Sequence, residues 1–173
     1  MGIVPVYRER AEKSNRDLTI SLPCPYYETL HDMAGSEREK FAIIAHSGTH
    51  DKLYQVASLG LTAAVMGKDV YVFLFFWALK KFTNGTLDQA DSPVGHEGES
   101  ERLAQVMKEK KIPTISEMIR DAKALGNLKI IACSAQPEIM EIAKDGMGTL
   151  IDDVWGLPTI LNTMRGAQVQ LFI

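Results

Sequence analysis

Three short stretches of this chain are almost wholly apolar, and each is followed by a segment with helical spacing. They are residues 41–45, 70–75 and 128–133. Strands that read as continuous apolar runs are buried on both faces, as in parallel sheets covered by helices. Strands that alternate with helices favour the same arrangement. The sequence therefore predicts an α/β fold with a mainly parallel sheet and helices on both of its faces.

The segments between and after these strands are expected to be helical. Apolar residues recur at helical spacing from Leu53 to Ala64, and Gly67 is placed to end that helix. Further helices are expected over residues 76–82, 99–111, 116–125 and 157–164, and a last strand over 168–173. Another helix is expected after Cys133, with Pro137 in its first turn and its end near Gly146. Residues 83–98 form the longest expected loop, which is a common place for a mobile or interfacial element.

The N-terminal part of the chain differs from the rest. Residues 8–17 are polar, residues 18–22 fit a short edge strand, and Cys24 lies between two prolines. Prolines so close together exclude a helix interior or a central strand. The sequence thus divides into an N-terminal extension, residues 1–38, and an α/β domain, residues 39–173.

Composition and charge argue against several classes of protein. The chain has 19 basic and 22 acidic residues, a net charge of -3 and no long basic cluster, so no nucleic-acid partner is expected. The longest apolar stretch, residues 70–79, is too short to span a membrane, and residues 1–17 lack a signal-peptide core. Two cysteines do not make a disulfide scaffold. The expected compartment is the cytoplasm.

Cys133 ends the third apolar run and is the main candidate for chemistry. It precedes Ser134, Gln136 and a helix with Pro137 in its first turn. Free N–H groups and the dipole at a helix N-terminus favour the thiolate, although Glu138 nearby opposes it. The polar neighbours indicate an exposed thiol, with Ser134 and Gln136 as binding residues. The competing interpretation is a buried cysteine that acts as a small, inert hydrophobe.

The loop after the first strand is a candidate binding segment. Right-handed crossovers place it, with the loops 76–98 and 133–137, at the carboxyl edge of the sheet. Ser47, Gly48 and Thr49 offer backbone donors to an anion such as a persulfide, and His50 follows them. His46 and His50 are four residues apart, but Gly48 breaks the helical geometry of a zinc pair. No metal site and no cofactor are expected.

Trp77 follows the second strand at the same edge. Its ring is a candidate wall for a binding pocket, and packing in the core is the alternative. The chain contains no GxxxxGK[ST], GxSxG or HExxH motif. Nucleotide hydrolysis of the P-loop type and serine-hydrolase chemistry therefore lack support.

Several segments taken together resemble a known family. They come in a fixed order along the chain: Phe41–Gly48, Asp51–Lys52, Met66–Val70, Phe75–Leu79, Ile130–Ser134 and a late segment around Gly156. Over about residues 40–173 the chain resembles the DsrE/DsrF-like family, and most its peroxiredoxin-like branch. The resemblance implies a three-layer α/β/α sandwich with a mainly parallel sheet. It also implies homo-oligomers.

The same resemblance implies a function in sulfur relay. Cys133 matches the family's sulfur-carrying position, so it is expected to hold sulfane sulfur as a persulfide, received from a donor protein and passed to an acceptor protein. This is the activity of a sulfurtransferase or sulfur carrier. The branch often has Gly-Asp-x-Asp-Lys in its first loop, where this chain has Gly48-Thr49-His50-Asp51-Lys52. No Pro-x-x-x-Thr-x-x-Cys stretch supports peroxidase activity.

Two alternative functions and the role of Cys24 stay open from the sequence. The chain fits a module that binds a small anionic or nucleotide-like ligand at residues 46–51, with Cys133 incidental. It also fits a structural subunit of an oligomeric relay complex with no chemistry of its own. Cys24 fits a structural loop cysteine, or a resolving partner for Cys133.

Overall fold

A computed structural model of the chain describes residues 38–91, 93, 95–96, 98–143 and 146–173. Its elements are β1 (Lys40–Ala45), α1 (His50–Val65), β2 (Asp69–Leu74), α2 (Phe76–Thr83), α3 (Ser100–Glu109), α4 (Ile115–Ala124), β3 (Leu128–Cys133), α5 (Gln136–Ile139), β4 (Asp153–Trp155), α6 (Leu157–Met164) and β5 (Val169–Phe172). The expected strand at 18–22 and Cys24 lie outside the described residues. The domain boundary at residue 38 stays a prediction.

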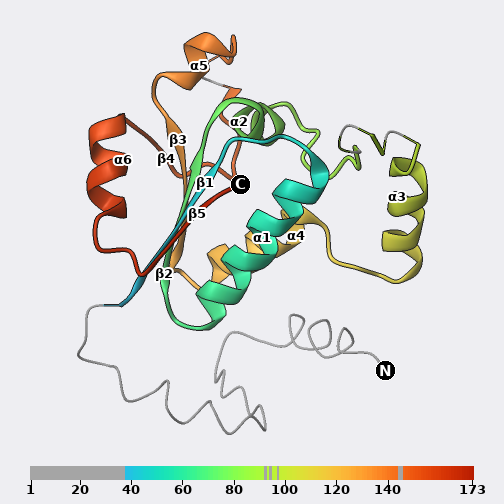
Figure 1. The fold of residues 1–173 in the computed structure, drawn as a ribbon, viewed down its shortest axis with the longest axis horizontal. Helices are drawn as coiled ribbons and strands as arrows, with labels where there is room; N and C mark the ends of the chain where they lie inside the picture. The colour runs from blue at the N-terminus through green and yellow to red at the C-terminus, as the bar shows by residue number, and fades with distance from the viewer. Residues whose placement is uncertain (1–37, 92, 94, 97, 144–145) are drawn as a thin grey trace, which may run out of the picture. The chain divides into compact units, whose positions relative to one another are not determined.

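The strands form one sheet in the order β4-β3-β2-β1-β5, and every neighbouring pair is parallel. Figure 1 shows α6 on one face of this sheet and α1 with α4 on the other. The predicted three-layer α/β/α sandwich is therefore confirmed. Within the described ranges, no helix is both long and apolar enough to cross a membrane. The cytoplasmic compartment stays a prediction.

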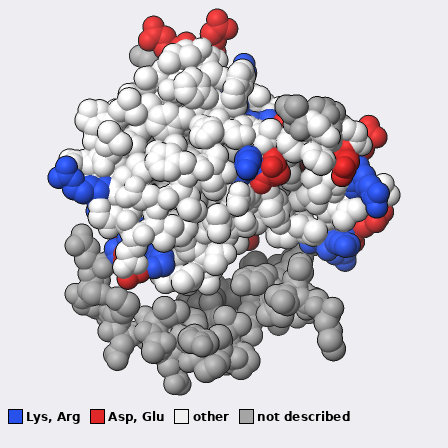
Figure 2. Space-filling view, in the orientation of Figure 1, with Lys and Arg blue, Asp and Glu red and all other residues white. Residues whose placement is uncertain are grey.

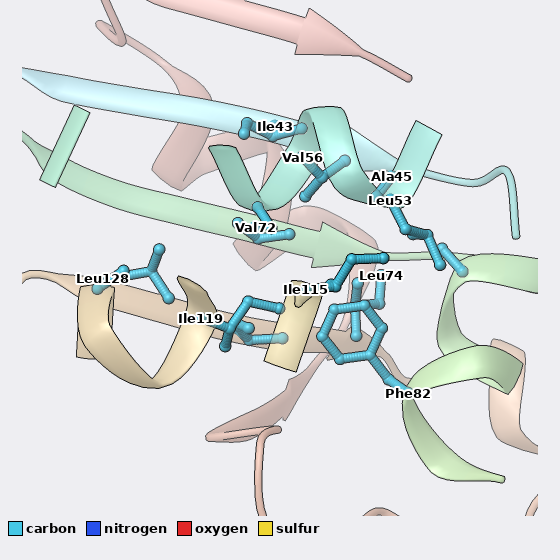
Figure 3. Packing of buried hydrophobic residues seen from close by; sticks show 14 of the residues in the cluster. Ile43, Ala45, Leu53, Val56, Val72, Leu74, Phe82, Ile115, Ile119 and Leu128 are labelled. Atoms are coloured by element: carbon cyan, nitrogen blue, oxygen red, sulfur yellow. The ribbon is translucent and has the colours of Figure 1, made fainter. Parts of the chain in front are cut away.

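Burial on both faces explains why the central strands lack polar residues. Successive side chains of a strand point to opposite faces. Ile43, Val72 and Ile130 pack toward α1 and α4, while Phe73 and Ile131 pack toward α6. Figure 3 shows the larger cluster, in which side chains of α1, α4 and α2 meet the sheet. A continuous apolar run is thus needed to fill two cores at once.

Local signals account for the ends of the helices. Gly67 has a φ of 76°, and its N–H donates to the carbonyl of Ala64 at 2.9 Å, which closes α1. The Thr114 side chain and the Glu117 side chain cap the start of α4 reciprocally. Such a capping box satisfies backbone donors that the first turn leaves free. The predicted helices at these positions are confirmed.

The region after Cys133 differs from the expectation. The helix expected to end near Gly146 is shorter: α5 has only 4 residues and ends before Glu141, whose φ is 54°. Glu141 adopts a left-handed conformation, so the turn does not continue past Met140. The sequence also gave no signal for β4, because its 3 residues, Asp153–Trp155, contain no apolar run.

Candidate functional site

The loops after β1, β2 and β3 meet at the carboxyl edge of the sheet, as the parallel topology predicts. The N–H of Phe75 donates to the carbonyl of Ala45 at 2.8 Å, and that of Ala78 donates to the carbonyl of His46 at 3.4 Å. The N–H of Phe76 donates to Oε1 of Gln136 at 3.4 Å. The first residues of α2 therefore join the other two loops.

Gly48 lets the first loop lie directly against α2. A Cβ atom at this position would lie 2.9 Å from both the Cβ and the carbonyl oxygen of Trp77. Next to this contact, Phe76 has a φ of 41°, which is strained for a residue with a side chain. Trp77 itself is 61% exposed, so packing in the core is not its role. Its ring lies on the surface with the ammonium of Lys80 5.8 Å from its centroid.

An internal carboxylate already occupies the start of α1. The backbone N–H of His50 donates to Oδ1 of Asp91 at 2.8 Å, and Asp91 also pairs with Nζ of Lys81 at 2.9 Å. The hydroxyls of Ser47 and Thr49 lie 3.2 Å apart and bond to each other. Binding of an external anion by Ser47, Gly48, Thr49 and His50 stays a prediction, and at His50 the anion would have to displace Asp91.

The imidazole of His50 is buried on the α1 side of the sheet, at 4% exposure. Burial lowers its pKa first of all, and Lys81 acts in the same direction. Asp91, Asp88 and Asp51 act against this shift. Because a buried imidazolium loses its hydration, the neutral ring is favoured. In the described part of the chain, no group of three or more His, Cys, Asp and Glu side chains is placed to hold a metal ion.

Cys133 lies on the opposite side of the sheet and is fully buried, at 0% exposure. It packs in the α6-face cluster with Phe73, Ile131 and Ile160, and Trp155 covers this cluster from β4. The expectation of an exposed thiol is therefore wrong for this structure. The one-turn α5 is also too short to supply the macrodipole on which the thiolate argument relied.

The two polar residues after Cys133 make structural contacts. The N–H of Ser134 donates to the carbonyl of Trp155 at 2.8 Å and continues the pairing of β3 with β4. Gln136 is buried and accepts the hydrogen bond from Phe76. The structure thus brings Gly48, Trp77 and Gln136 to one edge, whereas the Cys133 thiol is buried in the α6-face cluster. Their roles in binding stay predictions.

Part of the chain matches the model of a protein family. Residues 90–172, which include Cys133, match the model of the DsrE/DsrF/DrsH-like family. This match confirms the resemblance to DsrE/DsrF-like proteins, and the peroxiredoxin-like branch stays a prediction. Similarity to that family over this part of the chain suggests a role related to sulfur relay.

The chain was also compared with solved structures and with curated proteins. Among solved structures, a protein of unknown function from Methanobacterium thermoautotrophicum is similar, with a TM-score of 0.46 and 9% sequence identity. The similarity covers 78% of this chain and 99% of that chain. In the comparison with curated proteins, none matched.

Proposed function

We propose that this chain is a sulfur carrier of a relay, with sulfane sulfur held on Cys133 as a persulfide. One observation carries the proposal. The part of the chain that is similar to the DsrE/DsrF/DrsH-like family contains a single cysteine, Cys133. It is the last residue of β3 and lies at the carboxyl ends of the strands, where ligands bind in open parallel sheets.

The chemistry needs two thiol exchanges and no external oxidant or reductant. The Cys133 thiolate attacks the outer sulfur of a donor persulfide, R–S–SH. The donor S–S bond breaks, R–S⁻ leaves and Cys133–S–SH forms. An acceptor thiolate then takes the outer sulfur in the same way and returns the Cys133 thiolate. Donor and acceptor proteins are the partners that this cycle requires.

Burial of Cys133 adds a condition to this cycle. A donor persulfide or an acceptor thiol can reach the Cys133 sulfur only when the layer above it opens, because the side chain has no contact with solvent. The covering residue, Trp155, belongs to the three-residue edge strand β4, which pairs with β3 alone. Short edge elements open at a lower free energy than central strands. A partner that displaces β4 would therefore expose the thiol without unfolding the core.

Treatment of the full chain with inorganic polysulfide, followed by intact-protein mass spectrometry, tests the proposal. The wild type is expected to gain one sulfur atom, and Cys133→Ser is expected to lose this adduct. Cys24→Ser is the matched control and should keep it. No adduct on the folded wild type, or an adduct that survives in Cys133→Ser, would contradict sulfur carriage by this residue.

The buried thiol also favours a second function, that of a binding or structural subunit of a relay complex without chemistry of its own. In this case Cys133 is a small core hydrophobe. Cys133→Ser would then assemble and bind its partners as the wild type does. The polysulfide experiment separates the two functions, since only the carrier gains sulfur at this position.

We also propose that the chain associates with a second copy through the edge of the sheet that β5 forms. This edge strand contains no charged residue, and Phe172 at its end is 68% exposed. Figure 2 shows few charged side chains on the surface around it. Phe172 pairs with Ile44 of β1, which lines a groove together with Phe75 and Trp77. Uncharged edge strands beside exposed apolar side chains favour pairing with another chain.

Substitution of Phe172 by Lys is expected to shift the protein toward the monomer, because a buried, unpaired ammonium opposes a strand-edge interface. Light scattering coupled to gel filtration measures the mass. Val65→Lys is the matched control, since Val65 is also exposed but lies at the end of α1 in the other layer. A monomeric wild type, or equal masses for both variants and the wild type, would contradict this interface.

A further inference from the structure

A second pocket lies between α6 and the sheet, and none of its residues is among those that the sequence analysis singled out. Its volume is about 480 Å³. We call it the α6 pocket. Its lining includes Lys40, Tyr71, Trp155, Thr159, Asn162 and Thr163. A volume of this order is typical of pockets that hold small organic molecules.

Two aromatic rings form one wall of the α6 pocket. The centroids of Tyr71 and Trp155 lie 6.4 Å apart, with 41° between the ring planes. The indole is fixed from two sides: its Nε1 donates to Oδ2 of Asp153 at 2.6 Å, and its ring lies 6.3 Å from that of Phe73. Both wall residues stay partly exposed. Partly exposed, fixed rings are suited to stacking on a planar ligand.

The charges around the α6 pocket favour an anion. Lys40 lines it, and Lys129 of β3 pairs with Tyr71 and so lies on the same face of the sheet as the pocket. The two carboxylates on this face are engaged: Asp153 accepts the indole hydrogen bond, and Asp69 pairs with Arg38 at 3.7 Å. Neither lysine forms a salt bridge with a described residue. Because Lys129 interacts electrostatically with Asp153, Lys40 is the lysine left for a ligand, and its ammonium group argues for a negatively charged one.

Polar groups of α6 complete the opposite wall. The hydroxyl of Thr163 donates to the carbonyl of Thr159 at 2.9 Å, so it is already satisfied. The Asn162 amide has no hydrogen bond to a described residue and can both donate and accept. An amide of this kind can bond the polar edge of a heteroaromatic ring. The wall therefore adds selectivity for a ring with hydrogen-bonding atoms.

We infer that the α6 pocket binds a planar heteroaromatic molecule that carries an anionic group. The ring stacks against Tyr71 and Trp155, its edge meets Asn162, and the anionic group pairs with Lys40. This binding site is separate from the sulfur chemistry proposed for Cys133, and it can exist whether or not that cysteine carries sulfur. Its ligand would nevertheless rest on Trp155, the residue that covers the cysteine.

Titration of the full chain with adenosine monophosphate tests this inference, because the probe combines a heteroaromatic ring with a phosphate. In a Trp77→Phe background, Trp155 is the sole tryptophan and reports on stacking. Saturable quenching is expected. Adenosine and ribose phosphate, each with half of the recognised groups, should bind at least about tenfold more weakly.

Variants assign the signal to the pocket. Lys40→Gln is expected to weaken the binding of adenosine monophosphate at least about tenfold and to leave the affinity for adenosine unchanged. Lys52→Gln, an exposed lysine of α1 in the other layer, is the matched control and should bind as the wild type does. The inference is overturned by a lack of saturable quenching, by equal affinity in Lys40→Gln and the wild type, or by ribose phosphate binding as tightly as the full probe.

Discussion

Alkylation of Cys133 by iodoacetamide is expected to be at least about 100-fold slower in the native chain than in the same chain unfolded in urea. The reason is that the thiol has 0% exposure under α6 and Trp155. Reagent then reacts only with molecules that have opened, and a factor of 100 corresponds to about 2.8 kcal/mol of opening free energy. A Cys24→Ser background leaves one thiol, so the rate reports on Cys133 alone.

The covering residue gives a second, sharper measurement. Trp155→Ala in the same background is expected to raise the native alkylation rate about tenfold, since it removes the ring that lies over the cluster. Trp77→Ala is the matched control, because Trp77 is an exposed tryptophan of α2 and does not belong to the cluster around Cys133. Native and unfolded rates within a factor of about three would show an accessible thiol and would refute its burial.

Substitution of Gly48 by Ala is expected to lower the free energy of unfolding by about 2 kcal/mol. The new methyl group would lie 2.9 Å from the Cβ and the carbonyl oxygen of Trp77, and one of these atoms belongs to the backbone. A backbone atom cannot move aside as a flexible side chain can, so the loop or the start of α2 must shift. Urea unfolding followed by circular dichroism measures the loss.

Gly98 provides the matched control for this experiment. A Cβ at Gly98 would have no neighbour within 4 Å, and its φ is not left-handed. Gly98→Ala should therefore change stability by no more than about 0.5 kcal/mol. Equal stability of Gly48→Ala and Gly98→Ala would mean that the first loop does not pack against α2 as described. Because both variants add one methyl group, the difference isolates the contact.

Much of the fold could be predicted because its determinants are local. Apolar runs marked β1, β2 and β3, and Gly67 marked the end of α1 through its left-handed conformation. β4 could not be predicted, because its pairing depends on a neighbour already placed by tertiary structure. The predicted length of the helix after Cys133 was also wrong, since the apolar residues beyond Met140 pack from a loop and not from a helix face.

The candidate site was predictable only in part. Parallel topology correctly brought Gly48, Trp77 and Gln136 to one edge. Exposure of Cys133 could not be inferred from its polar neighbours, because the cover comes from α6 and Trp155, far along the chain. The role of Asp91 at the start of α1 was missed for the same reason: a single acid in a long loop has no periodic signal.

The pairing of β1 with β5 has a consequence during synthesis of the chain. Phe41 lies opposite Val169, so one side of β1 stays without its partner until the ribosome has released almost every described residue. Until then, a nascent chain that has already formed β1, β2 and β3 presents an open edge beside Ile44. Such edges recruit other strands. Chains that stop before β5 should therefore aggregate more than chains that include it.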